Sequence, residues 1–400
     1  MLPLSGVRVI AVEQYGAGPF GTQYLSDFGA EVIKIESPDG GDVSRSVGPF
    51  FMEGAADDDT AASLFYQGLN RNKRSLTLDL KDDVGQEILR ALAATADAVC
   101  NNLRGDVPVK LGLTYDALKE VKPSLVCAHL SAYGRDNERA AWPGYDFLMQ
   151  AETGYFSVTG EPDGPPARMG LSIVDLMAGL SMSFGLVSSV MQARQIGTGR
   201  DIDVNLFDTA LYNLNYIGHW YLGAGHNQGR EPRSAHASLA PCQLYKTGSG
   251  WIYIMCNKEK FWGILCDLMD CADLKADTRF LTFKERLTNR DELTSLIDAA
   301  LAPKTTEQWL EVFQGRVPAA PLFDVAQALE NPFVRERERI ATATMPDGRT
   351  VDMLANPIHL QNEPYPQRAA PALGVDNDDI LKELGYDANR IATLRERGVI

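Results

Sequence analysis

Short apolar runs alternate with amphipathic segments along the first half of the chain. Five runs are typical of buried strands, at residues 6–12, 31–36, 97–102, 124–133 and 201–207. Apolar positions at helical spacing lie between or after them, at residues 86–96, 145–155, 174–195 and 209–223. This alternation predicts an α/β fold, in which a parallel sheet carries helices on its faces.

The pattern changes after a polar linker at residues 224–238. Residues 242–256 hold two alternating runs around Gly248-Ser249-Gly250, which is typical of a β-hairpin, and short helical patterns follow. We therefore expect residues 225–325 to form a smaller α+β domain. The remaining tail is rich in proline and turns.

Composition and charge narrow the classes of function. The 400 residues are 45% hydrophobic, enough for a large core and two domains. The formal net charge of −15 argues against nucleic acid as a partner, because a phosphate backbone needs a basic surface. No signal-peptide pattern and no run of eighteen uncharged apolar residues is found, so we expect a cytoplasmic protein with no membrane contact. The six cysteines show no CxxC spacing and the five histidines form no HxxxH or HxH pair, so no metal site is expected.

One carboxylate, Asp175, stands in the apolar segment RMGLSIVDLMAG at residues 168–179. A buried charge is costly unless it is paired, neutralised or used in chemistry. A structural interpretation is a helix N-cap, because a helical pattern begins just after this residue. The segment alone does not choose between a cap and a reactive carboxylate.

The segment from Gly16 to Gly21 matches GxGxxG, and Glu36 ends the next strand pattern. Together they are typical of a dinucleotide site, but Glu13-Gln14-Tyr15 separate the glycines from the preceding apolar run. We expect the small residues either to admit a phosphate-bearing ligand or to allow close packing of a helix on the sheet.

Positive residues gather in one part of this acidic chain. Those in and after the segment GLNRNKRSLTLDLK are Arg71, Lys73, Arg74, Lys81, Arg104 and Lys110. They form either a solvated face or a binding surface for a nucleotide phosphate.

Six ordered motifs give the sequence a family resemblance. They are GVRVIAVEQYGAGPFGTQYLSDFGAEVIKIE, NRNKRSLTLDLK, NNLRGDVPVKLGL, PGYDFLMQAETG, DGPPARMGLSIVDLMAG and GTGRDIDVNLFD. In this order and spacing the chain resembles the class III CoA-transferases, a family that includes formyl-CoA, carnitine and succinyl-CoA:glutarate CoA-transferases. The resemblance implies a Rossmann-like large domain built from residues 1–224 and 326–400, with residues 225–325 as the smaller domain. It also implies an interlocked homodimer.

Particular residues follow from this resemblance. Asp175 falls on the nucleophilic aspartate of the family. The positions implied to line the CoA site are Gly16, Ala17, Leu78, Lys81, Asn102, Leu103, Arg104, Lys110, Tyr145 and Asp146. Arg45 and Arg168 are left over as candidates for pairing a substrate carboxylate, with salt bridges of their own as the alternative.

The expected activity is transfer of CoA from an acyl-CoA donor to a carboxylic acid. We expect succinyl-CoA or a similar dicarboxyl-CoA as donor, with mixed-anhydride and aspartyl-CoA thioester intermediates on Asp175. Coenzyme A thioester then enters as a substrate, and no permanently bound cofactor or metal is needed.

Three departures bear on this expectation. The formyl-CoA members carry Gln where this chain has Gly16, so formyl-CoA and oxalate are not expected as substrates. Residues 255–262, MCNKEKFW, lack the glycines that such members have over the site. Acyl-CoA racemases of the superfamily carry His where this chain has Tyr145, a weak base at neutral pH. A racemase or isomerase remains the alternative activity, and a CoA-binding or flavin protein without transfer chemistry is a third.

Overall fold

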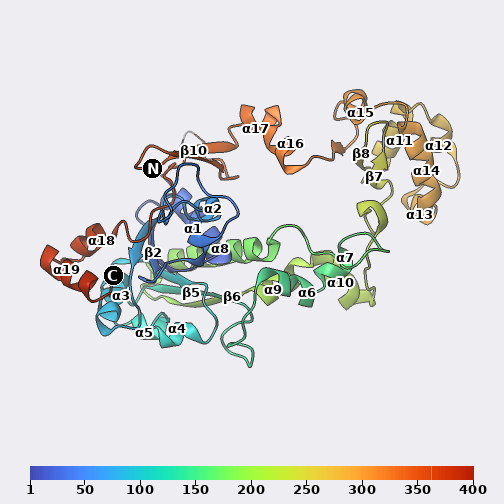
Figure 1. Cartoon of the computed structure of the whole chain (residues 1–400). Helices are drawn as coiled ribbons and strands as arrows, with labels where there is room; N and C mark the ends of the chain where they lie inside the picture. Colours follow the sequence, from blue (N-terminus) through green and yellow to red (C-terminus); the bar gives the residue numbers. More distant parts are fainter. Residues whose placement is uncertain (362) are drawn as a thin grey trace. The chain divides into compact units, whose positions relative to one another are not determined.

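The computed structural model describes residues 1–361 and 363–400, which divide into two compact units. Unit 1 consists of Met1–Thr153, Gly170–Asn215 and Phe333–Ile400, and unit 2 consists of Gly154–Met169 and Tyr216–Pro332. Both chain ends thus belong to unit 1 (Figure 1). The domain boundaries expected from the sequence stay a prediction.

Unit 1 contains a six-stranded sheet in the order β3-β2-β1-β4-β5-β6, and every pairing is parallel. The strands are β1 (Arg8–Val12), β2 (Glu31–Glu36), β3 (Arg74–Thr77), β4 (Ala98–Asn101), β5 (Val126–Ser131) and β6 (Arg200–Asn205). The predicted parallel α/β sheet is therefore confirmed. Because the strand order reverses between β1 and β4, the loops after these two strands diverge and leave room for a ligand.

One strand, β3, was not predicted. It spans only four residues, RSLT, and Leu76 is its single large apolar residue, so no apolar run marks it. The C-terminal segment completes this edge of the sheet, since Asp376 and Asn377 accept hydrogen bonds from the main-chain N–H groups of Ser75 and Thr77 at 2.8 and 2.9 Å.

Helices cover the sheet of unit 1. They are α1 (Ala17–Asp27), α2 (Leu64–Asn70), α3 (Asp83–Thr95), α4 (Val107–Lys110), α5 (Tyr115–Leu118), α6 (Asp146–Glu152), α8 (Ile173–Ile196), α9 (Leu206–Asn213), α18 (Asn377–Glu383) and α19 (Ala388–Glu396), with the 3-10 turn η1 (Val43–Ser46). The hairpin β10 (Ile340–Thr344) and β11 (Thr350–Leu354) completes the unit. The core under the sheet joins Ile10, Ile33 and Leu76 to Leu381 and Leu394 of the last two helices.

Two glycines let α1 and α8 touch along their main chains. A β-carbon at Gly21 would lie 2.4 Å from the carbonyl oxygen of Gly179, and one at Gly179 would lie 2.4 Å from that of Ala17. Such distances exclude any side chain at either position, so this crossing is fixed by residue type.

Unit 2 is built on the antiparallel sheet β7-β8-β9, which includes the predicted hairpin. Its strands are β7 (Cys242–Lys246), β8 (Trp251–Met255) and β9 (Ala319–Pro321). Its helices are α7 (Tyr155–Val158), α11 (Glu259–Leu268), α12 (Ala272–Ala276), α13 (Phe283–Thr288), α14 (Arg290–Leu301), α15 (Thr306–Phe313) and α16 (Val325–Glu330), with η2 (Pro232–Ser234). Helices α10 (Asn215–Ala224) and α17 (Pro332–Glu336) begin at the unit boundaries.

By length and composition, α8 is the one helix in the described part of the chain that could cross a membrane. Its mean hydropathy reaches 1.6, and 39% of that window is buried within the structure. In unit 1 this helix packs on α1 and on the strands β5 and β6. A single helix with this length and composition is weak evidence for a membrane span.

Candidate active site

A pocket of about 350 Å³ opens in unit 1 at the carboxyl ends of the strands. The turns after β1, β4 and β5 meet the first turn of α8 there. Seven of the residues implied by the family resemblance line it, namely Gly16, Ala17, Asn102, Leu103, Arg104, Tyr145 and Asp175. The structure thus brings together residues that lie up to 159 positions apart in the sequence.

Asp175 is the third residue of α8, whose N-cap is Ser172. The helix therefore begins two residues before Asp175, and the interpretation of this carboxylate as an N-cap is wrong. The main-chain N–H of Asp175 donates to Oδ2 of Asp146 at 3.0 Å. The amide of Gln150 holds the other oxygen of Asp146 at 2.6 Å. The capping role at the start of α8 thus passes to Asp146, a residue brought there by α6.

The environment of Asp175 raises its pKa from 3.8 to about 7. Burial is the larger cause, because it removes water from the charged form, and the nearby negative charge of Asp146 is the second. Among the described residues, no cation or hydrogen-bond donor offsets these two effects. Asp175 is consequently a carboxylate held close to its point of ionisation at neutral pH.

Gly16 faces this carboxylate directly. A β-carbon at Gly16 would lie 2.7 Å from Oδ2 of Asp175, so only glycine leaves the side chain where it is. Gly16 is also the N-cap of α1, and the first N–H groups of a helix lack partners within the helix. The positive end of the α1 dipole therefore faces the side of the pocket where Asp175 lies.

The other glycines of the GxGxxG segment have a packing role. Gly18 and Gly21 lie inside α1, where added β-carbons would meet Asn102 and α8 respectively. The side-chain amide of Asn102 is itself engaged, because it accepts from the N–H of Gln14 at 2.9 Å and donates to the carbonyl of that residue at 2.7 Å. The close-packing alternative thus accounts for these two glycines.

Leu78 and Lys81 line a second pocket, of about 310 Å³, with residues that follow β2 and β3. Both pockets lie at the same edge of the sheet, since both are lined by residues at the carboxyl ends of parallel strands. Arg104 and Lys110 stand near the first pocket with exposed side chains, and both form ion pairs with Asp106. They are cations that a ligand phosphate can reach.

The rest of the predicted basic cluster is structural. Arg71 pairs with Asp27 at 2.6 Å, Lys73 pairs with Glu13 at 2.8 Å, and Arg74 pairs with Glu31 at 2.6 Å. Burial lowers the pKa of Lys73 to about 8. These side chains neutralise carboxylates of unit 1 and do not form a solvated face or a phosphate surface.

Arg45 does not line the pocket, so the expected contact with a substrate carboxylate is wrong. Its guanidinium is buried and donates to both carboxylate oxygens of Glu36, at 2.7 and 2.8 Å. It also lies 3.9 Å from the ring centre of Tyr66. Arg168 and residues 255–262 belong to unit 2, so their expected roles stay predictions.

Sequence reasoning missed several residues that line the pocket. They are Gln14, Tyr15, Val107, Leu130, Ser131, Ala132, Trp142, Pro143, Gly144 and Leu206. Most follow the carboxyl ends of β1 and β5 or precede α6, and position after a parallel strand is a signal that would have found them. Among the described residues, no group of three or more His, Cys, Asp or Glu side chains could hold a metal ion.

Comparison with known proteins identifies the family. The profile described as CoA-transferase family III matches residues 4–377. The chain belongs to CoA-transferase family III. It is therefore a transferase of the EC 2.8.3 type, and CoA thioesters are the substrates of this family.

Relatives with different substrates match this family III chain equally well. The succinate–glutarate CoA-transferase of Agrobacterium fabrum is 31% identical and the match covers 96% of each chain. The acetyl-CoA:oxalate CoA-transferase of Acetobacter aceti is 32% identical over 95% of each chain. A crystal structure of a CAIB/BAIF family protein from Brucella suis has a TM-score of 0.83 and 31% identity, covering 96% of this chain and 99% of that one. The overall sequence identity therefore identifies the class of reaction but does not identify the acid substrates.

Proposed function

We propose that Asp175 is the nucleophile of a CoA transfer between two carboxylic acids. The observation that carries this proposal is the half-buried Asp175 carboxylate. It lines the pocket with a pKa of about 7, and in the described part of the chain no cation lies beside it. A carboxylate with little water and no counter-ion is a stronger nucleophile than a solvated one. The same shielding protects an anhydride from hydrolysis.

The transfer proceeds in four steps. An oxygen of Asp175 attacks the thioester carbonyl of the donor, the C–S bond breaks, and CoA thiolate leaves behind a mixed anhydride. The thiolate attacks the aspartyl carbonyl, which releases the donor acid and leaves an aspartyl-CoA thioester. The acceptor carboxylate attacks that thioester and expels the thiolate, giving a second anhydride. The thiolate then attacks the acceptor carbonyl, so that acyl-CoA leaves and Asp175 is restored.

Main-chain donors beside the carboxylate fit this chemistry. Each tetrahedral step puts negative charge on a carbonyl oxygen, and N–H groups at the start of a helix stabilise such charge. The start of α1 at Gly16 and Ala17 is one such helix N-terminus, since Gly16 adjoins Asp175 Oδ2. Lys81, Arg104 and Lys110 then hold the phosphates of CoA, as their place at the carboxyl edge of the sheet favours.

For the acids we propose succinyl-CoA or a similar dicarboxyl-CoA as donor. The relative named for succinate and glutarate supports this choice. Phe184 and Met191, which are 79% and 61% exposed on α8, support a homodimer in which the second copy covers this helix. A cytoplasmic location and the absence of a permanent cofactor belong to the same proposal.

The test is to trap the acyl-enzyme. The protein is incubated with succinyl-CoA and then with hydroxylamine, and peptides are analysed by mass spectrometry. A hydroxamate on Asp175 that requires the thioester supports the proposal. Asp175→Asn serves as the matched control, since it retains the shape of the side chain and should bind CoA but form no adduct.

Two results would count against the proposal. Wild-type turnover by the Asp175→Asn variant would exclude a covalent role for this residue. Deuterium incorporation from solvent at the α-carbon of the acyl group, without an adduct, would instead favour the racemase or isomerase alternative. A panel of acyl-CoA donors run in parallel separates a wrong donor from a wrong mechanism.

A further inference from the structure

The residue before Gly16 has an unusual main-chain conformation. Tyr15 has a φ of 65°, in the left-handed region that side chains other than glycine rarely adopt. Its ring is partly exposed and lies 5.1 Å from that of Phe65, which cannot by itself fix the main chain. Other groups must therefore hold this turn in place.

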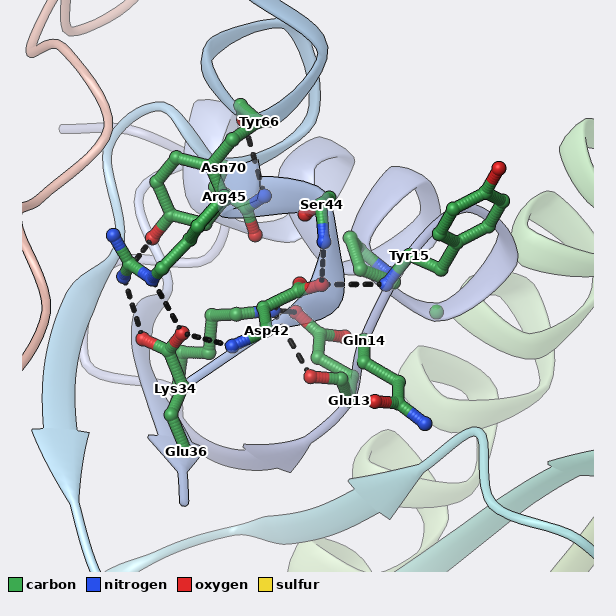
Figure 2. Close-up of polar contacts among 12 residues, drawn as sticks. Glu13, Gln14, Tyr15, Lys34, Glu36, Asp42, Ser44, Arg45, Tyr66 and Asn70 are labelled. Carbon is green, nitrogen blue, oxygen red and sulfur yellow. Dashed lines mark hydrogen bonds and ion pairs between the residues drawn. The ribbon is translucent and has the colours of Figure 1, made fainter. Parts of the chain in front are cut away.

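Side chains in and after β2 form hydrogen bonds that fix the main chain at Tyr15. Oδ1 of Asp42 accepts the main-chain N–H of Tyr15 at 2.9 Å, and Nζ of Lys34 donates to the carbonyl of Glu13 at 3.0 Å. Lys34 and Asp42 are joined to each other at 2.8 Å, and both side chains are completely buried. Figure 2 shows this chain of contacts running from Lys34 through Asp42 to the main chain of Tyr15.

The pair is fixed from several sides. Although burial acts to raise the pKa of Asp42, the Lys34 ammonium and the N–H groups of Tyr15 and Ser44 lower it below its ordinary value. The main-chain N–H of Asp42 in turn donates to Glu36 at 3.0 Å. Asp42 is therefore an ionised acceptor held rigidly under the turn, and charge-assisted hydrogen bonds of this kind are the stronger ones.

We propose that Asp42 and Lys34 are positioning residues for the nucleophile. The buried pair holds Tyr15 in its left-handed conformation and so sets the main chain of Gly16 against the carboxylate of Asp175. The space between Gly16 and Asp175 is small, since a β-carbon at Gly16 would lie 2.7 Å from Oδ2 of Asp175. This inference rests on the proposed role of Asp175, and neither Asp42 nor Lys34 lines the pocket itself.

The test asks whether a residue that accepts positive φ can replace the pair. The double variant Lys34→Met with Asp42→Ala removes both charges together, so that neither is left unpaired in the interior. Into this background we would place Tyr15→Gly or, as the matched control, Tyr15→Ala. Both lose the ring, but only glycine adopts the left-handed conformation without strain.

The readout is the rate of Asp175 adduct formation at saturating succinyl-CoA, with CoA affinity measured in parallel. We expect the double variant to slow adduct formation at least about ten-fold, with CoA affinity changed less than about three-fold. Glycine at position 15 should then restore about ten-fold relative to alanine, the factor that left-handed strain in an L-residue implies. In the wild-type background the same two substitutions should differ less than about two-fold.

Equal rates for glycine and alanine in the double variant would overturn the inference, as would a wild-type rate in the double variant. Absence of an adduct in the wild-type protein would instead overturn the proposed function, and this inference with it. If the double variant does not fold, Asp42→Asn carries the same comparison, because loss of the charge breaks the ion pair with Lys34 and weakens the hydrogen bond to the N–H of Tyr15.

Discussion

The like charge of Asp146 is one of the two causes that raise the pKa of Asp175, and its removal gives a quantitative test of the site. Asp146→Asn leaves the side-chain shape and one acceptor oxygen for the N–H of Asp175 but removes the negative charge. Since burial is the larger cause, Asp146 contributes less than half of the rise from 3.8 to about 7. The substitution should therefore lower the pKa of Asp175 by up to ~1.5 pH units.

The assay is the pH dependence of kcat/KM for CoA transfer between about pH 5 and 9, which reports ionisations of the free enzyme. In the proposed mechanism only ionised Asp175 attacks a thioester, so activity should fall as the pH drops through the pKa, with a midpoint near 7 in the wild-type protein. In Asp146→Asn the midpoint should move to lower pH, whatever happens to the plateau. The plateau itself should drop, because the single oxygen cannot serve both Gln150 and the N–H of Asp175.

The matched control is Asp116→Asn, which removes an exposed carboxylate of α5 that pairs with Lys119. It should leave the midpoint unchanged, because a solvated charge outside the pocket is screened. A midpoint in Asp146→Asn that stays within about 0.3 pH units of wild type, or moves upward, would refute the reasoning. It would mean that burial alone, or another group, sets the pKa of Asp175.

Three further predictions follow from the geometry. Gly16→Ala should reduce the rate of transfer more than about ten-fold, because the added β-carbon displaces the Asp175 carboxylate. The control is Gly68→Ala, which should leave the rate unchanged because an added β-carbon there meets nothing within 4 Å. Asp175→Asn should stabilise the fold by ~1–2 kcal/mol at pH 8 in denaturant titrations, and this gain should vanish near pH 4. The reason is that Asp175 ionises at lower pH in the unfolded chain than in the folded one, so the wild-type protein loses stability as the pH rises to about 7. Arg45→Lys should lower the denaturation midpoint, because it breaks the two hydrogen bonds to Glu36, and should leave KM for the acid substrates unchanged. A raised KM with an unchanged midpoint would instead indicate that Arg45 binds a substrate.

The sequence predicted the features of this chain that are local. Apolar runs marked five of the six strands, and an ionisable residue in an apolar segment marked Asp175. Strand β3 escaped because it has no apolar run of its own, while Asp376 and Asn377, whose side chains accept two of its N–H groups, lie about 300 residues away. Its four residues carry no signal that a periodicity analysis can detect.

Charged residues show the same limit more strongly. For Arg45 the sequence left open a substrate carboxylate or a salt bridge, and for Lys73 a phosphate surface or a solvated face, yet both are buried against carboxylates, Glu36 and Glu13. The partner of Lys73 lies 60 residues away in the sequence, so no local pattern distinguishes a neutralised charge from a free one. Likewise Asp146 was expected to contact CoA, while the structure gives it a second role as the acceptor for the start of α8.

The position of Asp175 is a consequence of how two helices cross. Asp175 lies four residues before Gly179, so the two share one face of α8, and Ala17 stands in the same relation to Gly21 on α1. Main-chain contact at the two glycines therefore brings the first turns of both helices together, with Gly16 against Asp175. Because main-chain atoms form the contact at Gly21 and Gly179, the close approach of the two helices there does not depend on side-chain rotamers. The Asp175 carboxylate, whose charged form is destabilised where it lies, is thus positioned by a contact between two main chains.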